Sequence, residues 1–410
     1  MTTATPPTGT GPLERREARL AWGLLFPTIA IVSAVVILPL LAIFWISFKP
    51  IGLADLRPPA PVVRESLRGS DDNLRLEYRL RNSSQSEAIS NVTLSDSIPG
   101  GVTVVSADDR CEFSGQAFTC DIGTMDGGAR ERIEVFVSID GDEETIEAAV
   151  EGTIPSLTGS GKNILTNFEF TGENFARVFD GDEFWEVLYV TLFYTVVGTI
   201  GALVFGLFAA MLLNKEFKGQ GILRGLYLFP YVAPVIAVAF AWIILFDPFS
   251  GSANALLVQM GVTNEAINFF GERPLALIMV TVFEIWRYFP LSFLFILARM
   301  QSIDTDMYEA ADMDGASPFQ KFWFLSLPQL LGILSVLFLL RFIWTFNKFD
   351  DIFLLTGGNA GTRTLTVNVY EQAFAISNIG AGAAVAVVIF CCLLLFSVFF
   401  FKFVSREEGL

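Results

Sequence analysis

The chain has 410 residues, 52% of them hydrophobic. This composition excludes a soluble globular protein, because its stretches of about 20 apolar residues match the hydrocarbon thickness of a bilayer. The formal charge of −16 is concentrated in residues 51–183, where 25 acidic side chains outnumber 11 basic ones, and the absence of His removes the imidazole base and the commonest zinc ligand, so we expect no metal site.

The amino-terminal part has the pattern of a cytoplasmic tail followed by a first membrane span. Residues 1–19 form the tail, which is rich in Thr, Pro and Gly up to residue 13, as in disordered segments, and then basic. The apolar run 20–48 is too long for a signal peptide and ends without a small-residue cleavage site, so we expect an uncleaved transmembrane helix. The basic flank predicts a cytoplasmic amino terminus.

Residues 49–183 form an acidic insert with the periodicity of β-strands. Apolar and polar side chains alternate over 74–80, 92–94 and 133–137. Turn-forming stretches such as 99–101 and 126–128 separate these runs. Short strands at this spacing predict a small β-sandwich, which an amphipathic interfacial segment connects to the next span.

Part of this insert, residues 70–152, resembles the Ig-like repeats of prokaryotic surface proteins. The resemblance rests on Asn82, on the stretches 92–96 and 98–101, on Cys111 and on 120–123, and it implies an interaction role rather than chemistry. We expect Cys111 and Cys120 to form a disulfide in an extracytoplasmic module, with two free thiols as the alternative. Four neighbouring carboxylates could bind calcium, but we expect a solvated acidic loop instead; they belong to Asp140, Asp142, Glu143 and Glu144.

Residues 184–410 are expected to form the rest of the membrane part. Five further apolar segments, giving six transmembrane helices in all, cover 187–213, 226–246, 275–298, 329–349 and 379–403. Pro230 and Pro234 are expected to kink the second of these. Basic residues flank the loops that this order places inside, so the sequence predicts a multi-pass protein of the cytoplasmic membrane with both termini in the cytoplasm.

A short polar stretch, residues 302–328, lies between the fourth and fifth spans and is predicted to form two small helices. Thr305 or Asp304 can cap the first helix, and Gly315 can take the left-handed conformation that ends it. Ser317 and Pro318 can start the second helix. Small residues in the first helix and aromatic residues in the second would form a knob suited to a groove on another protein.

The sequence of this stretch resembles the cytoplasmic coupling loop, or EAA motif, of ABC importer permeases. The resemblance rests on 309–311, Gly315 and the Leu-Pro pair 327–328. It implies a separate ATPase that would contact Glu309, Ala310, Ala311, Asp314, Gly315 and Pro328. The chain has no Gly-rich phosphate loop, so we expect no ATP hydrolysis and no cofactor in this chain, with ATP and Mg bound to the partner ATPase.

Ionisable side chains inside the fourth and fifth spans point to a polar site, because each costs about 3 kcal/mol at mid-bilayer. Two sets share the spacing i, i+3, i+4, i+7: Glu284, Arg287, Tyr288 and Leu291, and Arg341, Trp344, Thr345 and Lys348. Two such faces on consecutive helices predict one cavity with groups for sugar hydroxyls and aromatic faces for sugar rings. The alternative is that Glu284 pairs with Arg287 or Arg341 only to hold helices together, while Lys348 snorkels to the outer surface.

Residues 185–405 are similar to the first permease subunit of maltose-type sugar importers, through the stretches 283–290, 340–350 and 354–358. The resemblance implies an all-α polytopic membrane protein with the type I ABC importer permease fold, here with an inserted extracytoplasmic β-sandwich. It implies that the eight residues of the two sets contact the sugar. The partners implied are a second permease subunit, two copies of an ABC ATPase and an extracytoplasmic solute-binding protein. Two features depart from that family: the insert follows the first span, and the cavity is more charged than a neutral disaccharide requires.

The sequence therefore predicts a permease subunit, not an enzyme, that imports a di- or oligosaccharide such as an α-glucoside by alternating access. A glycerol-phosphate-type or other polar solute is the alternative for the same kind of transporter. A proton-coupled secondary transporter with Glu284 as the relay would leave the Glu309 stretch unexplained. An anchored adhesion or sensor protein would need no polar faces inside its spans. We expect no binding to nucleic acid.

Overall fold

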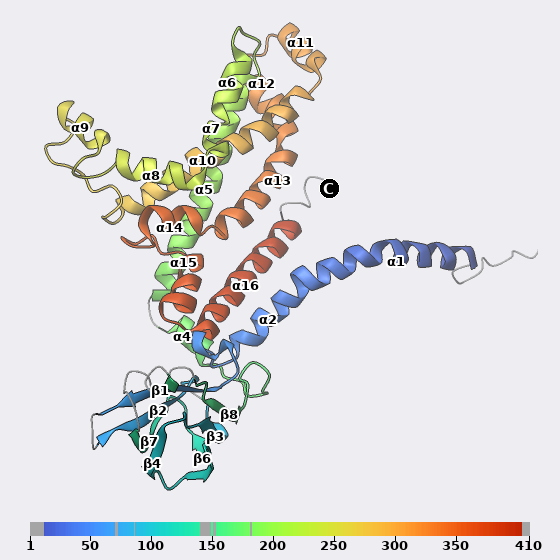
Figure 1. The fold of residues 1–410 in the computed structure, drawn as a ribbon. Helices are drawn as coiled ribbons and strands as arrows, with labels where there is room; N and C mark the ends of the chain where they lie inside the picture. The colour runs from blue at the N-terminus through green and yellow to red at the C-terminus, as the bar shows by residue number, and fades with distance from the viewer. Residues whose placement is uncertain are drawn as a thin grey trace, which may run out of the picture. The chain divides into compact units, whose positions relative to one another are not determined.

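The computed structural model describes residues 12–69, 73–85, 87–139, 149–150, 153–180 and 183–403. Most of the tail predicted to be disordered, and the four carboxylates weighed above as a calcium site, lie outside these ranges. The chain divides into two compact units (Figure 1). Unit 1 comprises residues 1–174 and 376–384, and unit 2 comprises residues 175–375 and 385–410.

Unit 1 begins with a long helical run where the first span was predicted. The run consists of α1 (Pro12–Val32), a π-helical stretch (Ser33–Ile37) and α2 (Leu38–Ser47). Its part from Arg16 to Ser47 is long and apolar enough to cross a membrane. The side chains of its most apolar window are not buried by protein, as expected of a surface that lipid covers.

Unit 1 also contains a β-domain, whose described residues form two four-stranded antiparallel sheets. The strands are β1 (Pro61–Arg68), β2 (Arg75–Asn82), β3 (Ile89–Ser97), β4 (Val102–Ala107), β5 (Cys111–Ser114), β6 (Ala117–Met125), β7 (Arg130–Ile139) and β8 (Ser156–Gly161). The first sheet has the order β1-β2-β7-β4 and the second β5-β6-β3-β8. The three alternating stretches of the sequence lie in β2, β3 and β7, and the predicted turns connect β3 to β4 and β6 to β7.

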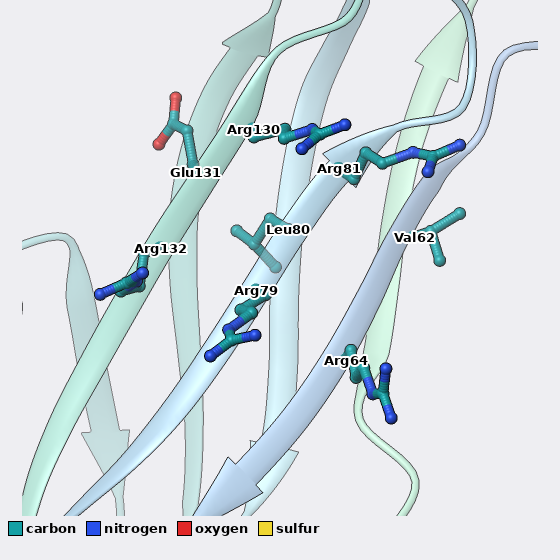
Figure 2. Close-up of a pocket in the computed structure, with 8 residues that line it drawn as sticks. All are labelled: Val62, Arg64, Arg79, Leu80, Arg81, Arg130, Glu131 and Arg132. Atoms are coloured by element: carbon teal, nitrogen blue, oxygen red, sulfur yellow. The ribbon is translucent and has the colours of Figure 1, made fainter. Parts of the chain in front are cut away.

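The two faces of the first sheet differ in chemistry because side chains alternate along each strand. Its outer face carries Arg side chains on three neighbouring strands, β1, β2 and β7. Figure 2 shows five of them around one groove: Arg64, Arg79, Arg81, Arg130 and Arg132.

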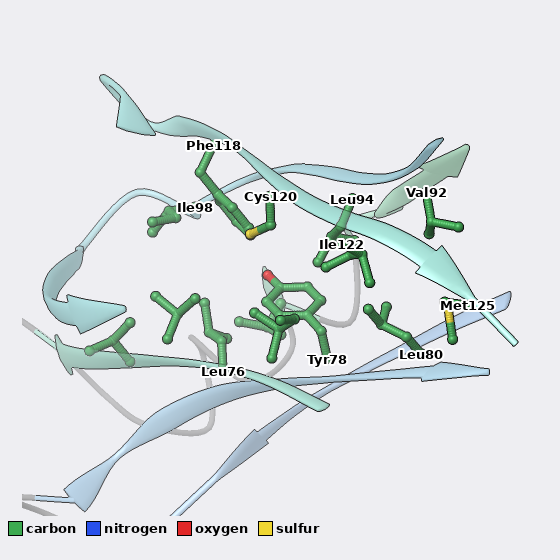
Figure 3. Close-up of a cluster of buried hydrophobic side chains, with 14 of the residues drawn as sticks. Leu76, Tyr78, Leu80, Val92, Leu94, Ile98, Phe118, Cys120, Ile122 and Met125 are labelled. Atoms are coloured by element: carbon green, nitrogen blue, oxygen red, sulfur yellow. The ribbon is translucent and has the colours of Figure 1, made fainter. Parts of the chain in front are cut away.

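The inner faces of the two sheets share one apolar core (Figure 3). Leu76, Tyr78 and Leu80 of β2 lie in the same cluster as Leu94 of β3 and Phe118 of β6, and each is at most 2% exposed. Alternation with period two fixes this arrangement, since a slip of one residue would turn every one of these side chains to solvent. At the edge of this core, the buried Cys120 of β6 lies directly opposite Cys111 of β5, and the two form a disulfide.

Unit 2 is helical. Its elements are α4 (Glu173–Phe179), α5 (Glu183–Leu213), α6 (Gln220–Tyr227), α7 (Phe229–Val232), α8 (Val235–Leu245), α9 (Ser252–Gln259), α10 (Leu275–Gln301), α11 (Thr305–Met313), α12 (Pro318–Lys321), a π-helical stretch (Phe322–Ser326), α13 (Leu327–Phe346), α14 (Asp350–Thr356), α15 (Leu365–Tyr370), a second π-helical stretch (Glu371–Ala375) and α16 (Ile379–Phe403), with α4 and α16 extending into unit 1. Within the described ranges of the whole chain, five helices are long and apolar enough to cross a membrane, or six if one bent pair counts as a span.

The bent pair replaces the kinked third span that the sequence predicts. Residues 220–232 and 235–245 meet at an angle of 90°. The break falls at Ala233 and Pro234, whose ψ angles of 142° and 126° are extended. A residue before proline avoids the helical region and proline itself donates no backbone hydrogen bond, so the helix stops there rather than bending.

Two of the stretches that connect the predicted spans contain helices. Residues 350–378 include α14 and α15, and residues 247–273 include α9. In α14 the side chains of Asp351, Ile352 and Leu355 are buried. This segment is therefore packed structure rather than a solvated loop, and it brings an acidic side chain toward the polar residues of α10 and α13.

Candidate functional site

Close packing of α5 against α10 places Glu284 at the centre of the helical unit. A Cβ atom on Gly198 would lie 3.0 Å from Cγ of Glu284, and one on Gly206 would lie 2.7 Å from Cβ of Ser292. Small residues at such positions let two helix backbones approach each other in a membrane. The glycines of α5 thus create the room in which the side chain of Glu284 is held.

The carboxylate of Glu284 is buried and receives three donors. Arg341 of α13 donates from Nη2 to Oε1 at 2.6 Å, and the Thr345 hydroxyl donates to the same oxygen at 2.9 Å. The hydroxyl of Tyr194 on α5 donates to Oε2 at 3.1 Å. Because ionised groups are stable out of water only when paired and hydrogen-bonded, these contacts join α5, α10 and α13 around one carboxylate.

A cavity of about 110 Å³ opens beside this pair. Seven of the eight side chains predicted to share a cavity line it, together with Tyr231 of α7. The lining residues are Tyr231, Glu284, Tyr288, Leu291, Arg341, Trp344, Thr345 and Lys348. The helical spacing of the two sets therefore places them around one space, as the pattern indicates.

Arg287, the eighth residue of the two sets, does not line this cavity. Its Nη1 donates to the carbonyl oxygens of Pro230 and Ala233, at 3.4 and 3.2 Å. These carbonyls lie at the end of α7, where Pro234 cannot supply the next helical donor. Arg287 therefore supplies hydrogen bonds to carbonyl oxygens at the break in the bent span.

Asp351, which is not among the eight residues predicted to line the cavity, belongs to the same charge network. Its side chain is 1% exposed, with Oδ1 3.9 Å from Nε of Arg287 and Oδ2 3.9 Å from Nζ of Lys348. Lys348 also lies 3.4 Å from Asp350. The available signal is the i, i+3 spacing of Lys348, just after α13, and Asp351 in α14; it does not point to the site while residues 350–378 are taken only as a connection between two predicted spans.

The ring of Tyr288 lies among the cations of this network. The Arg341 guanidinium and the Lys348 ammonium are 4.5 and 4.4 Å from the ring centroid, and the Arg287 guanidinium is 5.6 Å away. Such cation–π contacts are worth about 0.5–2 kcal/mol each, more where water is excluded. They leave a polar space bordered by aromatic faces, which suits a ligand with hydroxyl groups and C–H faces.

The polar stretch between α10 and α13 has the caps that its sequence predicts, but its second helix is not separate, because α12, the π-helical stretch and α13 form one helix, Pro318–Phe346. The Asp304 side chain caps α11 by accepting from Asp306 N, and Gly315 has a φ of +75°. Ser317 and Gln320 form a capping box at α12, with Pro318 as its first residue. Lys321 pairs with Asp312 at 2.5 Å and thereby ties the two short helices together.

The tip of this stretch presents apolar side chains to its surroundings. Met313, Phe319 and Phe324 are 89%, 70% and 76% exposed. Glu309, Ala310, Asp314 and Pro328 are exposed as well, and Ala311 is partly covered. Exposed large apolar side chains gathered at one end of a helical unit are typical of a protein–protein contact.

Known proteins similar to this chain are membrane transport components. The family model described as binding-protein-dependent transport system inner membrane component matches residues 202–407, from α5 to just beyond α16. The inner membrane ABC transporter permease protein YcjO of Escherichia coli is 38% identical over 218 residues, which are 53% of this chain and 73% of that protein. The trehalose/maltose transport system permease protein MalF of Thermococcus litoralis is 33% identical over 230 residues, 56% of this chain and 77% of that protein.

Solved structures agree on the fold. A chain of a bacterial alginate ABC transporter, crystallised with its alginate pentasaccharide-bound periplasmic protein, superposes with a TM-score of 0.54 and 18% identity. The match covers 58% of this chain and 83% of that chain. At this identity the likeness concerns the fold alone, the ABC importer permease fold of type I.

No group of three metal-ligating side chains occurs in the ranges that the structure describes.

The predicted resemblance to ABC permeases is confirmed by the family match and by the relatives. The chain belongs to the family of binding-protein-dependent transport system inner membrane components, as an ABC transporter permease subunit rather than an enzyme.

Proposed function

We propose that this permease imports a neutral sugar, a di- or oligosaccharide such as an α-glucoside, through the cavity beside Glu284 and Arg341. The observation that carries the proposal is the cavity lining, in which Tyr231, Tyr288 and Trp344 supply aromatic faces beside charged and hydroxyl groups. Aromatic faces pack on the C–H faces of pyranose rings, while carboxylate and guanidinium groups bind hydroxyls. Trp344 is 53% exposed and therefore available to a ligand.

The charges of the site favour a neutral ligand over a sugar phosphate or glycerol phosphate. Each cation already has a carboxylate of the same chain near it: Arg341 has Glu284, and Lys348 has Asp350 and Asp351. Asp351 is also the partner of Arg287. An anionic solute would have to displace these internal partners, whereas sugar hydroxyls can bind beside them. The relatives' names differ on this point, since one refers to trehalose and maltose and another to sulfoquinovosyl glycerol.

A second permease subunit would complete the path. The cavity of about 110 Å³ is smaller than the roughly 300–1,000 Å³ of common ligand sites. A partner permease facing α10 and α13 would supply the other wall, which supports a heterodimer in the cytoplasmic membrane.

The stretch from α11 to the start of α13 would bind a separate ABC ATPase, present in two copies, that carries ATP and Mg. Its exposed tip and capped short helices suit insertion into a groove on that subunit. ATP-driven closure of the ATPase would then move this stretch and open the cavity alternately to each side. An extracytoplasmic solute-binding protein would deliver the sugar, with both termini of the permease in the cytoplasm and the β-domain, as an Ig-like module, outside.

The proposal is tested by reconstituting the permease with its ATPase and solute-binding protein and by identifying the sugar that co-purifies. We expect Trp344→Ala to raise the sugar concentration needed for half-maximal ATP-driven uptake about tenfold, the loss expected for one stacking side chain. Leu331→Ala is the control, because Leu331 lies on the same helix, is 47% exposed and does not line the cavity. Uptake that follows a proton gradient without ATP, or equal behaviour of both variants, would contradict the proposal.

A further inference from the structure

The outer face of the first sheet of the β-domain concentrates the basic residues of an otherwise acidic region. Inward-facing side chains of β1, β2 and β7 pack into the core, so the intervening positions point outward. Seven of these positions are Arg: Arg64, Arg68, Arg75, Arg79, Arg81, Arg130 and Arg132. They are most of the 11 basic residues between 51 and 183, where 25 residues are acidic.

The register of the strands places these Arg side chains directly opposite one another. Arg79 of β2 faces Arg64 of β1 on one side and Arg132 of β7 on the other, and Arg81 faces Arg130. Like charges in directly opposed cross-strand positions are destabilising. The opposed Arg side chains therefore lower the free energy of unfolding of the β-domain. A binding role for this face accounts for their presence.

Carboxylates of the chain neutralise only part of this surface. Glu77 pairs with Arg79 and Arg132, and Glu134 pairs with Arg75 and Arg132. Arg64, Arg81 and Arg130 have no ion-pair partner among the residues that the structure describes. These three guanidinium groups border the groove shown in Figure 2, which has a volume of about 810 Å³.

The groove lining excludes two other kinds of ligand. Among the described residues, none that lines it is aromatic, the apolar ones are Val62 and Leu80, and the carboxylate of Glu131 is paired with Arg110. The groove therefore offers neither stacking for a neutral sugar nor the apolar centre of a protein–protein interface. Guanidinium groups are planar and bind carboxylates through two parallel hydrogen bonds. Neighbouring strands are about 4.8 Å apart and alternate residues of one strand about 6.7 Å apart, so the array can bind several anionic groups of one extended chain.

We propose that this groove binds an acidic oligosaccharide, a linear sugar chain that carries carboxylates on successive units. The need for repeated anionic groups follows from the groove itself. The choice of a carbohydrate rests on the proposed function, because the chain is then a sugar permease. This ligand is distinct from the neutral sugar of the membrane cavity, and the β-domain holds it on the protein surface.

The test measures binding of fluorescent tetragalacturonate to the full-length chain in nanodiscs of zwitterionic lipid, with maltotetraose and polyphosphate as comparison probes. We expect saturable binding of tetragalacturonate that weakens as NaCl rises from about 0.05 to about 0.5 M, because the contacts are ionic and exposed. The triple variant Arg64→Gln/Arg81→Gln/Arg130→Gln is expected to lose at least about tenfold in affinity. Transport is not measured, so the outcome is independent of the membrane cavity.

Two matched variants separate binding from charge and folding. The triple variant Arg57→Gln/Lys162→Gln/Arg177→Gln removes the same charge from exposed positions outside the groove and should bind as the unmodified chain does. Arg64→Lys/Arg81→Lys/Arg130→Lys keeps the charge but loses the paired hydrogen bonds, so an intermediate affinity is expected. Equal loss in the groove and control variants, equal binding of maltotetraose or tighter binding of polyphosphate would overturn the proposal. A lower melting temperature of the glutamine groove variant would also overturn it, because relief of the opposed Arg pairs should leave stability equal or higher.

Discussion

Glu284 and Arg341 form a buried ion pair beside the cavity. Their side chains are 0% and 2% exposed, and Oε1 of Glu284 lies 2.6 Å from Nη2 of Arg341. Glu284 and Arg341 are 57 positions apart in sequence and lie on α10 and α13. With the hydroxyls of Tyr194 and Thr345 also donating to Glu284, the carboxylate fixes the distance between three helices that border the cavity.

Arg341→Met is therefore expected to destabilise the membrane unit by about 3–5 kcal/mol. The substitution leaves the buried carboxylate without its countercharge, and two hydroxyl donors do not replace it. Thermal unfolding of the purified chain in detergent measures the loss. Arg273→Met serves as the control, because Arg273 pairs with Glu186 where both side chains are at least half exposed, and such pairs are worth under about 1 kcal/mol.

The double variant Glu284→Gln/Arg341→Met is expected to regain most of the lost stability. An amide at position 284 carries no charge; its oxygen can accept from Thr345, and its NH2 group can donate to the hydroxyl oxygen of Tyr194. Removing both charges of a buried pair is often nearly neutral, whereas removing one is costly. A double variant as unstable as Arg341→Met would show that packing of the Arg side chain, and not its charge, stabilises the unit.

Gly315→Val is expected to uncouple ATP hydrolysis from uptake in the reconstituted transporter. Gly315 has a φ of +75°, and a Cβ atom there would meet no atom within 4 Å. The substitution therefore acts through the backbone, at a cost of about 1–2 kcal/mol, and changes how α11 ends. The ratio of sugar imported to ATP hydrolysed is expected to fall at least about fivefold while the subunits still co-purify, since about 1 kcal/mol is a factor of about five.

The matched variant at this position is Gly315→Asn. Asn tolerates the left-handed conformation far better than a β-branched residue, so the turn after α11 should persist and coupling should remain near that of the unmodified chain. If Val and Asn behave alike, the backbone of this turn is not what transmits the movement of the ATPase.

Local features of the fold could be predicted from the sequence because they depend on neighbouring residues. The last span was predicted at 379–403, where α16 lies, and the caps at Asp304 and Ser317 and the end at Gly315 followed from residue type and order. The two polar faces of α10 and α13 also followed from helical spacing alone, and they enclose one cavity.

Features that depend on contacts between distant segments could not be predicted. Tyr194 and Asp351 join the charge network only because α5 and α14 pack beside α10. Arg287 was assigned to the cavity by its spacing, but the carbonyls exposed at the break before Pro234 take its hydrogen bonds. The sharpness of that break likewise depends on a partner that can satisfy those carbonyls, and such a partner is not visible in the local sequence.

In Lys49→Met, residues 163–174, which follow the β-domain in sequence, are expected to lose their attachment to the end of the first helical run. The Lys49 side chain is buried, and its ammonium donates to Asn167 O and Oδ1 and to Glu169 O at 2.5–2.8 Å. It also lies 4.4 Å from the ring centroid of Phe170. Methionine fills a similar volume but leaves two backbone carbonyls without donors, at about 1–3 kcal/mol each. Hydrogen exchange of residues 163–174 should rise at least about fivefold, and exposed Lys162→Met should leave it unchanged.

The core of the β-domain contains a tyrosine between two carboxyl groups. The hydroxyl oxygen of Tyr78 lies 2.9 Å from Oε1 of Glu65 and 2.8 Å from Oδ2 of Asp96. Burial and the two neighbouring carboxyl groups raise the pKa of Tyr78, so it keeps its single proton, which it can donate to one carboxylate only. Burial also raises the pKa of Glu65. A proton on Glu65, donated to the phenol oxygen while Tyr78 donates to Asp96, satisfies both contacts.

Glu65→Gln is therefore expected to stabilise the β-domain at pH 8. A carboxyl group whose pKa is raised by folding contributes stability below its unfolded pKa of about 4.3, and this contribution is lost as the pH rises through the raised value. An amide at position 65 can donate to Tyr78 and accept from Thr153 at every pH, so the gain at pH 8 should be about 1 kcal/mol, the usual net value of one hydrogen bond. Scanning calorimetry of the full chain at pH 5 and pH 8 measures the difference, which should shrink at pH 5. Glu112→Gln, on an exposed position of β5, should show no such pH dependence; a variant at position 65 that is less stable at pH 8 would show that Glu65 is held as a carboxylate.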